Sequence, residues 1–287
     1  MNRLLITGLG ISLALPLHAQ AARLSIVPTR PEPGAIVRLT LRDSAAGGAI
    51  TSIRGTMAGE PLHFVSSGRG MWRAIGGVPV DASGSVTAVA VVTRGPDVVD
   101  SITARAVVPR PRVATSRLNV DTGFTRPLDS ATAARVANEN ARARDVGRRA
   151  HETPQLWTRG FLPPRASEIT SRFGSGRLFN GQVTSRHLGV DFRGAVGDTV
   201  RAANRGVVAL VENFFLAGNV VYIDHGAGLV TGYFHLSQPL VAVGDTVARG
   251  QAIGLVGQTG RVTGPHLHWA ARYGALAVNP LDLLALR

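Results

Sequence analysis

Turn-forming residues interrupt this chain at short intervals. Its 287 residues include 34 glycines and 16 prolines, and apolar residues make up 45% of the sequence. Because glycine and proline end regular elements, such frequent turns favour short strands over long helices. Aromatic residues account for only 5%, so the core depends on Val, Leu, Ile and Ala. We therefore expect a mainly β globular protein, since a chain this apolar is not intrinsically disordered.

Cysteine content and charge exclude several classes of site. Cysteine is absent, which excludes disulfide scaffolds, thiolate metal sites and cysteine nucleophiles. The 31 basic residues are all arginine and face 18 acidic residues, so the formal charge is +13. This charge favours polyanionic partners such as nucleic acid, anionic lipid or wall polymers. The arginines are scattered, with no run longer than Arg148-Arg149. A generally cationic surface is therefore favoured over a nucleic-acid site.

The first 21 residues have the pattern of a secretory signal peptide. Arg3 precedes an apolar stretch from Leu4 to Leu17, and Ala19-Gln20-Ala21 offers a small-residue cleavage site. The apolar stretch is shorter than the about 20 residues that a membrane-spanning helix needs. We expect residues 1–21 to be removed and the mature protein to be exported without a membrane span. A retained N-terminal anchor is the alternative.

Residues 22–109 are expected to form an N-terminal β domain. Short alternating apolar runs, such as 35–41, 85–92 and 101–108, are separated by turn residues. Strands at this spacing are typical of a small immunoglobulin-like β-sandwich. His63 is isolated in this segment, and we interpret it as structural.

Residues 110–155 are expected to form a helical connector. Asp129 or Ser130 provides an N-cap for a helix that extends to about Ala150. Arg135 and Glu139 have the i,i+4 spacing of a helical ion pair. The helix would be about 30 Å long, and its thin apolar face favours a surface spacer or strut between domains. His151, at its end, is interpreted as structural.

Residues 156–287 are expected to form a compact antiparallel β domain. Apolar runs alternate with glycine-rich turns, and Gly197-Asp198-Thr199-Val200 recurs as Gly244-Asp245-Thr246-Val247. Both copies are typical of tight hairpin turns. A segment of about 130 residues is long enough to bury its own core.

Five of the eight histidines lie in this last segment, between residues 187 and 268. His187 and Asp191 form a His-x-x-x-Asp motif, His266 and His268 form a His-x-His motif, and His235 lies between them. On a strand, residues i and i+2 point the same way, so His266 and His268 would face one site. Imidazole nitrogens and a carboxylate oxygen are ligands of catalytic Zn²⁺, which needs three protein ligands and an open position. The surplus histidines are candidates for proton transfer and charge stabilisation.

Beyond these motifs, residues 157–287 resemble the lysostaphin/LytM-type (β-lytic) zinc metallopeptidases, which cleave peptide bonds in bacterial peptidoglycan. Residues 24–109 are more loosely similar to the small β domain that precedes some of these peptidases. The resemblance to the peptidases rests on five stretches of sequence: 169–174, 187–191, 218–226, 233–237 and 259–269.

The resemblance implies a role for each histidine of the motif. His187, Asp191 and His268 would be the ligands of one zinc ion, and His235 and His266 the two catalytic histidines. Which of these two acts as the base stays open. His225 belongs to the family pattern without being a ligand.

The resemblance also implies a function. The chain would be a zinc metalloendopeptidase, a peptidoglycan hydrolase of the periplasm, the cell envelope or the medium. A D-amino-acid cross-link is favoured over a glycine bridge as its substrate. One alternative is a non-catalytic wall-binding protein that activates other hydrolases, and another is an enzyme that its own residues 24–155 restrain. A regulatory protein would be a second partner besides peptidoglycan.

Overall fold

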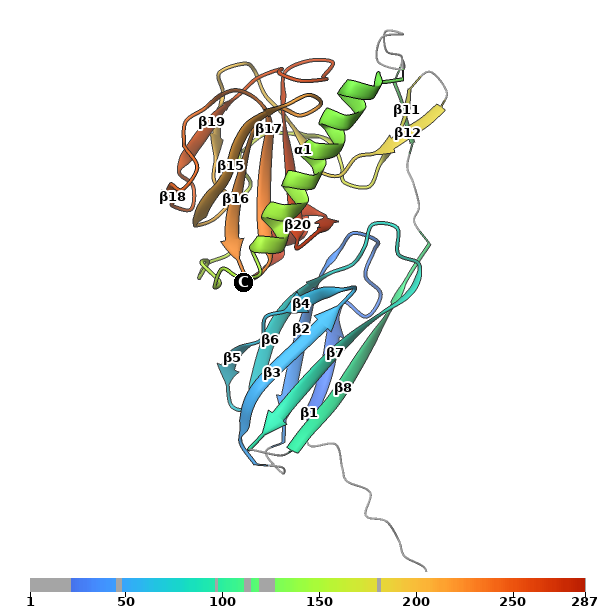
Figure 1. Ribbon diagram of the computed structural model, residues 1–287, viewed down its shortest axis with the longest axis vertical. Helices are drawn as coiled ribbons and strands as arrows, with labels where there is room; N and C mark the ends of the chain where they lie inside the picture. The colour runs from blue at the N-terminus through green and yellow to red at the C-terminus, as the bar shows by residue number, and fades with distance from the viewer. Residues whose placement is uncertain are drawn as a thin grey trace, which may run out of the picture.

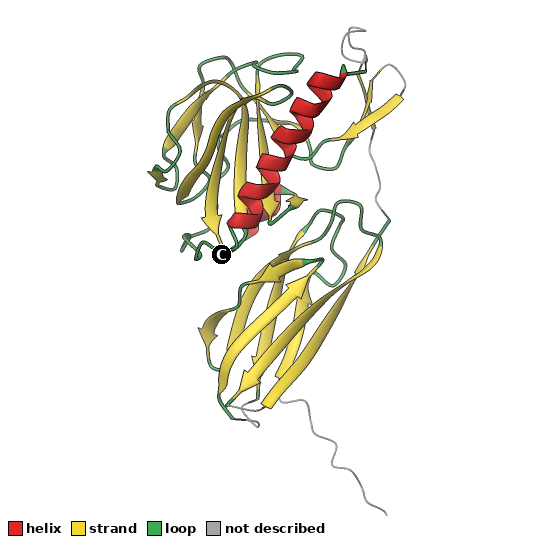
Figure 2. Cartoon of the chain, viewed as in Figure 1, coloured by secondary structure: helices red, strands yellow, loops and turns green. Residues whose placement is uncertain are grey.

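The computed structural model describes residues 22–44, 48–95, 98–110, 115–118, 127–179 and 182–286. The expected signal peptide, residues 1–21, lies outside this range. The described chain forms a β-sandwich and a second β domain with one long helix on its surface (Figure 1). Strands dominate both domains (Figure 2), so the predicted mainly β class is confirmed.

Two four-stranded antiparallel sheets make up the N-terminal domain. In spatial order, the first contains β1 (Ala22–Val27), β2 (Ile36–Asp43), β6 (Met71–Gly77) and β5 (Val65–Gly68). The second contains β4 (Glu60–Leu62), β3 (Ile50–Met57), β7 (Gly84–Arg94) and β8 (Val98–Val108). Every second side chain of β1 is buried, as expected for a sheet with one face on the core. The two sheets share one apolar core, so they form a sandwich, while the immunoglobulin-like character stays a prediction.

A ten-stranded antiparallel sheet forms the C-terminal domain. Its main path is β10 (Ile169–Ser171), β13 (Val190–Arg193), β20 (His266–Tyr273), β17 (Leu229–Pro239), β16 (Gly218–Gly226), β15 (Gly206–Phe214) and β18 (Thr246–Val247). Strands β14 (Thr199–Arg201), β19 (Ala252–Val256) and β21 (Leu276–Val278) pair off this path, and a 3₁₀ helix, η2, covers Pro280–Ala285. A separate small sheet contains β12 (Gln182–Arg186), β11 (Gly176–Phe179) and β9 (Thr115–Leu118).

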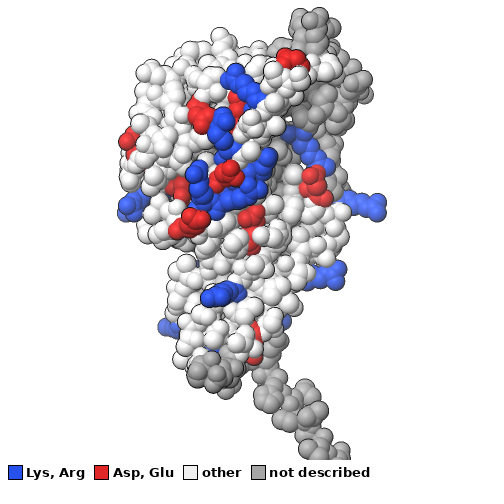
Figure 3. Space-filling model, in the orientation of Figure 1, with Lys and Arg blue, Asp and Glu red and all other residues white. Residues whose placement is uncertain are grey.

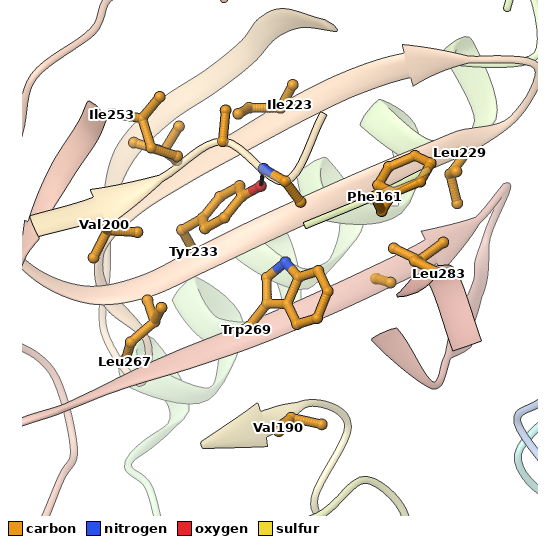
Figure 4. Close-up of a cluster of buried hydrophobic side chains, with 14 of the residues drawn as sticks. Phe161, Val190, Val200, Ile223, Leu229, Tyr233, Ile253, Leu267, Trp269 and Leu283 are labelled. Carbon is orange, nitrogen blue, oxygen red and sulfur yellow. Dashed lines mark hydrogen bonds between the residues drawn. The ribbon is translucent and has the colours of Figure 1, made fainter. Parts of the chain in front are cut away.

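The central strands are buried on both faces of this sheet. Nearly every residue of β16 and β17 is buried or half-buried, which explains why their sequences lack strict alternation. One face carries the main core, where Tyr233 and Trp269 are register partners on β17 and β20 (Figure 4). The Tyr233 hydroxyl accepts a hydrogen bond from the Ala203 amide at 2.8 Å, so this buried polar atom has a partner.

The helix α1 (Ser130–Arg149) covers the other face of the sheet (Figure 1). Its predicted start is confirmed, because Asp129 accepts a hydrogen bond from the Thr132 amide at 2.8 Å as N-cap. The predicted ion pair is also present, with Arg135 Nε 2.7 Å from Glu139 Oε1. The helix packs against the ten-stranded sheet of the C-terminal domain. It is therefore not the spacer or strut between domains that its sequence favoured. Its apolar face is thin because it consists of small residues, Ala143, Val146 and Ala150.

Charge on the helix side of the molecule is mixed. Basic and acidic side chains lie next to one another over this face (Figure 3), where Arg142 pairs with Glu212 and Arg148 with Asp145. The expected scatter of positive charge is therefore found here. Within the described ranges, no helix is both long and apolar enough to cross a membrane.

The two copies of the Gly-Asp-Thr-Val repeat form equivalent turns. Gly197 and Gly244 both have φ near +93°, a backbone conformation that favours glycine. The carboxylates of Asp198 and Asp245 each accept a hydrogen bond from the amide three residues earlier, at 2.8 Å. The expectation of hairpins is wrong, because the strands after the two turns, β14 and β18, pair with β19 and β15. Tight local geometry fixes the turn but does not choose the pairing partner.

The two domains contact one another through the end of β20, β21 and η2. The Ile36 amide donates to Asp282 at 2.9 Å, and the Asn279 amide donates to the Gly34 carbonyl at 2.7 Å. The Tyr273 hydroxyl, at the end of β20, donates to the Pro61 carbonyl at 2.6 Å. The contact is therefore made largely by backbone groups that a side-chain pattern does not reveal.

A chain of three titratable groups lies in the same contact. His63 Nε2 is 2.9 Å from His151 Nδ1, and His151 Nε2 is 3.0 Å from Glu60 Oε2. The other Glu60 oxygen accepts from the Ala275 amide at 3.0 Å. Sequence alone left His63 and His151 as isolated residues, and the structure brings them together across the domain boundary.

Candidate metal centre

Strand pairing places two of the predicted ligands opposite one another. In the register of β13 with β20, Asp191 is the partner of His268. His266 lies two residues earlier on β20, so it is on the same face. His187 lies in the short segment between β12 and β13. Three separate backbone positions therefore direct their side chains to one point.

Three ligand atoms converge at that point. His187 Nε2 is 2.9 Å from Asp191 Oδ1 and 2.9 Å from His268 Nδ1, and His268 Nδ1 is 2.8 Å from Asp191 Oδ1. His187 and Asp191 are buried, and His268 is half-buried. The three residues are a group that could hold a metal ion.

Backbone contacts define the tautomer of His187. Its Nδ1 lies 3.0 Å from the Arg172 carbonyl and 3.1 Å from Ser171 Oγ. A carbonyl oxygen only accepts hydrogen bonds, so Nδ1 carries the proton and the neutral ring presents a lone pair at Nε2. That lone pair points at Asp191 and His268, and a carbonyl that orients a histidine in this way is usual around metal sites.

Packing fixes the ring of His268. Phe234 stacks on it, with ring centroids 5.0 Å apart and an interplanar angle of 15°. Gly189 lies against the ring edge that carries Nε2 and Cε1, where a Cβ atom would collide with the His268 ring. The ring therefore has little freedom to turn away from the cluster.

Two further histidines, His235 and His266, complete the site. Their ring centroids are 4.8 Å apart. His235 Nδ1 donates to the Thr259 carbonyl and His266 Nδ1 to the Gly264 carbonyl, both at 2.9 Å. By the same argument both rings present an unprotonated Nε2, and that of His266 is 3.7 Å from Asp191 Oδ1.

The backbone of His235 is unusual for a residue with a side chain. Its φ of +59° lies in the left-handed region, which costs about 1–3 kcal/mol for a non-glycine residue. The Ala217 carbonyl accepts from the His235 amide at 2.9 Å and holds this conformation. Strain of this kind is concentrated at functional sites.

Electrostatics favour a charged Asp191 and a neutral His235. Burial by itself raises the pKa of Asp191, but the neighbouring His187 and His268 side chains outweigh it and hold the pKa well below its usual range. Burial, followed by the neighbouring His268 and His266, lowers the pKa of His235 to about 3.

His225 lies apart from this cluster. It is fully buried, with Nδ1 2.7 Å from the Arg205 carbonyl and Nε2 2.8 Å from Thr231 Oγ1. Burial lowers its pKa to about 4. Both nitrogens thus have partners inside the domain, as expected for a histidine of the core.

The cluster lies in an open groove of about 790 Å³. All five predicted site residues line it, together with Phe234 and four arginines. Sequence reasoning did not assign a role to Arg172 or Arg261, although both lie inside the quoted stretches 169–174 and 259–269. A positively charged residue inside each of these two stretches was the available signal.

Comparison with protein families identifies this groove. The model of peptidase family M23 matches residues 185–280, which contain all five site residues. The chain carries a family M23 peptidase domain. A solved structure described as a peptidase M23 from Pseudomonas aeruginosa is similar over 89% of this chain and 95% of its own, with a TM-score of 0.67 and 25% identity.

Two curated relatives of this M23 domain come from Vibrio cholerae. The chain is 49% identical over 116 residues to peptidoglycan DD-endopeptidase ShyA, a match that covers 39% of this chain and 26% of the relative. It is 35% identical over 172 residues to peptidoglycan DD-endopeptidase ShyC, a match that covers 58% of this chain and 36% of the relative. The matches thus span about a quarter to a third of these relatives.

Proposed function

We propose that the chain is an exported zinc-dependent endopeptidase that hydrolyses D-amino-acid cross-links in bacterial peptidoglycan. The observation that carries the proposal is the convergence of three ligand atoms and two histidines with unprotonated Nε2 atoms in one groove of an M23 domain. The curated names of ShyA and ShyC support the substrate class.

The donor set fits a zinc ion. Two imidazole nitrogens and one carboxylate oxygen face each other at 2.8–2.9 Å, and Nε2 of His187 has no proton to share. Three converging lone pairs are satisfied by a cation, and this set with an open position is that of catalytic zinc. When bound, zinc would lower the pKa of a water molecule and polarise a carbonyl group.

His235 and His266 would move protons beside this centre. One Nε2 would accept a proton from the attacking water, and the other ring would stabilise the developing oxyanion or protonate the leaving amine. Both rings keep Nδ1 bonded to a backbone carbonyl, so each has a fixed orientation toward the groove. Each ring can take either role, and single variants of the two histidines distinguish them.

Location follows from the substrate. Peptidoglycan lies outside the cytoplasm, so the proposal requires export, and the pattern of residues 1–21 supports it. The cationic surface suits an anionic wall.

The test combines metal content with hydrolysis. Full-length protein is incubated with purified sacculi, with and without a chelator, and released fragments are identified by mass spectrometry. We expect chelator-sensitive loss of cross-linked dimers that added zinc restores. His187→Ala should lose zinc and activity together, whereas His266→Ala should keep zinc and lose activity by about 10²–10⁴-fold.

Two outcomes would contradict the proposal. Full activity of the His266→Ala variant would remove the catalytic role of that histidine. Bound zinc without any release of fragments would favour the wall-binding activator or a restrained enzyme instead.

A further inference from the structure

The groove around the metal centre is strongly cationic. Arg172, Arg186, Arg193 and Arg261 line it, whereas Asp191 contributes the sole carboxylate among the described lining residues. Asp191 belongs to the ligand cluster. A substrate in this groove therefore meets positive charge beside the ligand cluster.

Two of the four arginines are already neutralised. Arg186 Nη1 is 2.9 Å from Asp81 Oδ1 and donates to the Val80 carbonyl at 2.8 Å. Arg193 Nε is 2.9 Å from Glu168 Oε2. These two guanidinium groups are occupied by carboxylates of the protein itself.

Arg172 and Arg261 differ from this pair. Both are exposed, and neither guanidinium group has a carboxylate or carbonyl partner among the described residues. Their backbones are nevertheless fixed, because the Arg172 carbonyl orients His187 and the Arg261 amide donates to the Leu216 carbonyl at 2.9 Å. Two unoccupied guanidinium groups thus extend from well-held positions on the groove wall.

We propose that Arg172 and Arg261 bind a free carboxylate of the substrate beside the scissile amide and so determine specificity. This inference rests on the proposed function. When a D-amino acid is joined to the side-chain amine of a diamino acid, the carbon next to the amide nitrogen can carry a free carboxylate. An oligoglycine bridge lacks such a group. Guanidinium groups bind carboxylates through two parallel hydrogen bonds, so the arginine pair favours the first kind of cross-link.

The experiment uses two synthetic cross-linked peptides. They are identical except that the carboxylate beside the scissile amide is free in one and amidated in the other. Wild-type protein, Arg172→Ala, Arg261→Ala and the double variant are compared on both. Arg201→Ala is the matched control, because Arg201 lies outside the groove and its Nη1 donates to the Gly250 carbonyl at 3.1 Å.

We expect the arginine pair to matter only for the acidic peptide. Wild-type protein should cleave it with a kcat/KM about tenfold or more higher than that for the amidated peptide, since hydrogen bonds between charged groups are stronger than those to a neutral group. The double variant should lose this preference, because its rate on the acidic peptide should fall to about its rate on the amidated one. An equal loss on both peptides, or a wild-type enzyme that does not distinguish them, would overturn the inference and leave the proposed function intact.

A binding measurement separates the two proposals. Calorimetry with His266→Ala protein should show tighter binding of the acidic peptide, and Arg172→Ala and Arg261→Ala should each remove that advantage. If wild-type protein cleaves neither peptide, the proposed function fails, and the binding result decides the carboxylate site by itself. Equal binding of both peptides would then refute it.

Discussion

At the scale of single residues, the site depends on partners that fix each ring. Backbone carbonyls bind Nδ1 of His187, His235 and His266, which leaves three Nε2 atoms for chemistry. The sequence predicts the residue types, because two motifs and an intervening histidine are specific. It does not predict the carbonyls, since Arg172, Thr259 and Gly264 provide them through backbone atoms that any residue carries.

Gly189→Ala is expected to displace His268 and weaken zinc binding. A Cβ atom at this position collides with the His268 ring, so the ring must shift from its present place beside Asp191. Loss of a supporting contact typically costs about 10–100-fold in metal affinity. Zinc titration with a competing chelator measures the change.

A second glycine of the same groove is the control. Gly264 has open space where a Cβ would lie, so Gly264→Ala should keep the wild-type zinc affinity. If both variants bind zinc equally well, the packing explanation for Gly189 is wrong.

At the scale of elements, α1 illustrates what a local pattern predicts. The N-cap Asp129 and the Arg135–Glu139 pair are local, and both are found as predicted. The docking of the helix is not local, because the sheet residues that it covers lie 60 or more positions away. Small side chains such as Ala143 and Gly147 give no amphipathic signal, yet they allow the helix to approach the domain closely.

Gly147→Ala should destabilise the protein, although alanine is the better helix former. Helix propensity alone would stabilise by about 1 kcal/mol. A Cβ atom at Gly147 collides with the Gly274 carbonyl, and overpacking of this kind costs about 1–3 kcal/mol. A lower midpoint of urea unfolding is the expected result.

Asn138→Ala provides the comparison on the same helix. Asn138 is exposed, so alanine there should leave the midpoint unchanged or raise it. A rise for Gly147→Ala as well would show that the helix does not press against Gly274.

At the scale of the whole molecule, the domain contact contains a titratable chain. Glu60, His63 and His151 are separated by up to 91 positions in sequence, so no motif predicts their contact. Tyr273 packs edge-on against His151, with ring centroids 5.4 Å apart. The sequence indicated two domains, whereas their mutual contact emerges only from the fold.

Mildly acidic pH is expected to weaken this contact. Burial, and then the neighbouring His151, lowers the pKa of His63 below its ordinary value of 6.5. Between the lowered pKa and 6.5, the unfolded chain therefore binds more protons than the folded chain. Neutral His63 therefore contributes to the free energy of unfolding at pH values above this window. The contribution is lost as the pH falls through the window.

Urea unfolding at several pH values between about 5 and 8 measures the effect. This range brackets the ordinary pKa of a histidine. His63→Gln should flatten the pH dependence, because glutamine keeps a polar side chain and does not titrate. An unchanged slope in this variant would assign the dependence to other groups.

Strand β20 joins the two halves of the molecule. It begins with His266 and His268 and ends with Tyr273, whose hydroxyl binds the N-terminal sandwich. Seven residue steps along a strand span about 24 Å. A force that pulls the sandwich away from the C-terminal domain would therefore be transmitted along one hydrogen-bonded strand to the proposed metal ligand His268. The molecule thus has a mechanical connection between its N-terminal sandwich and the groove of its C-terminal domain.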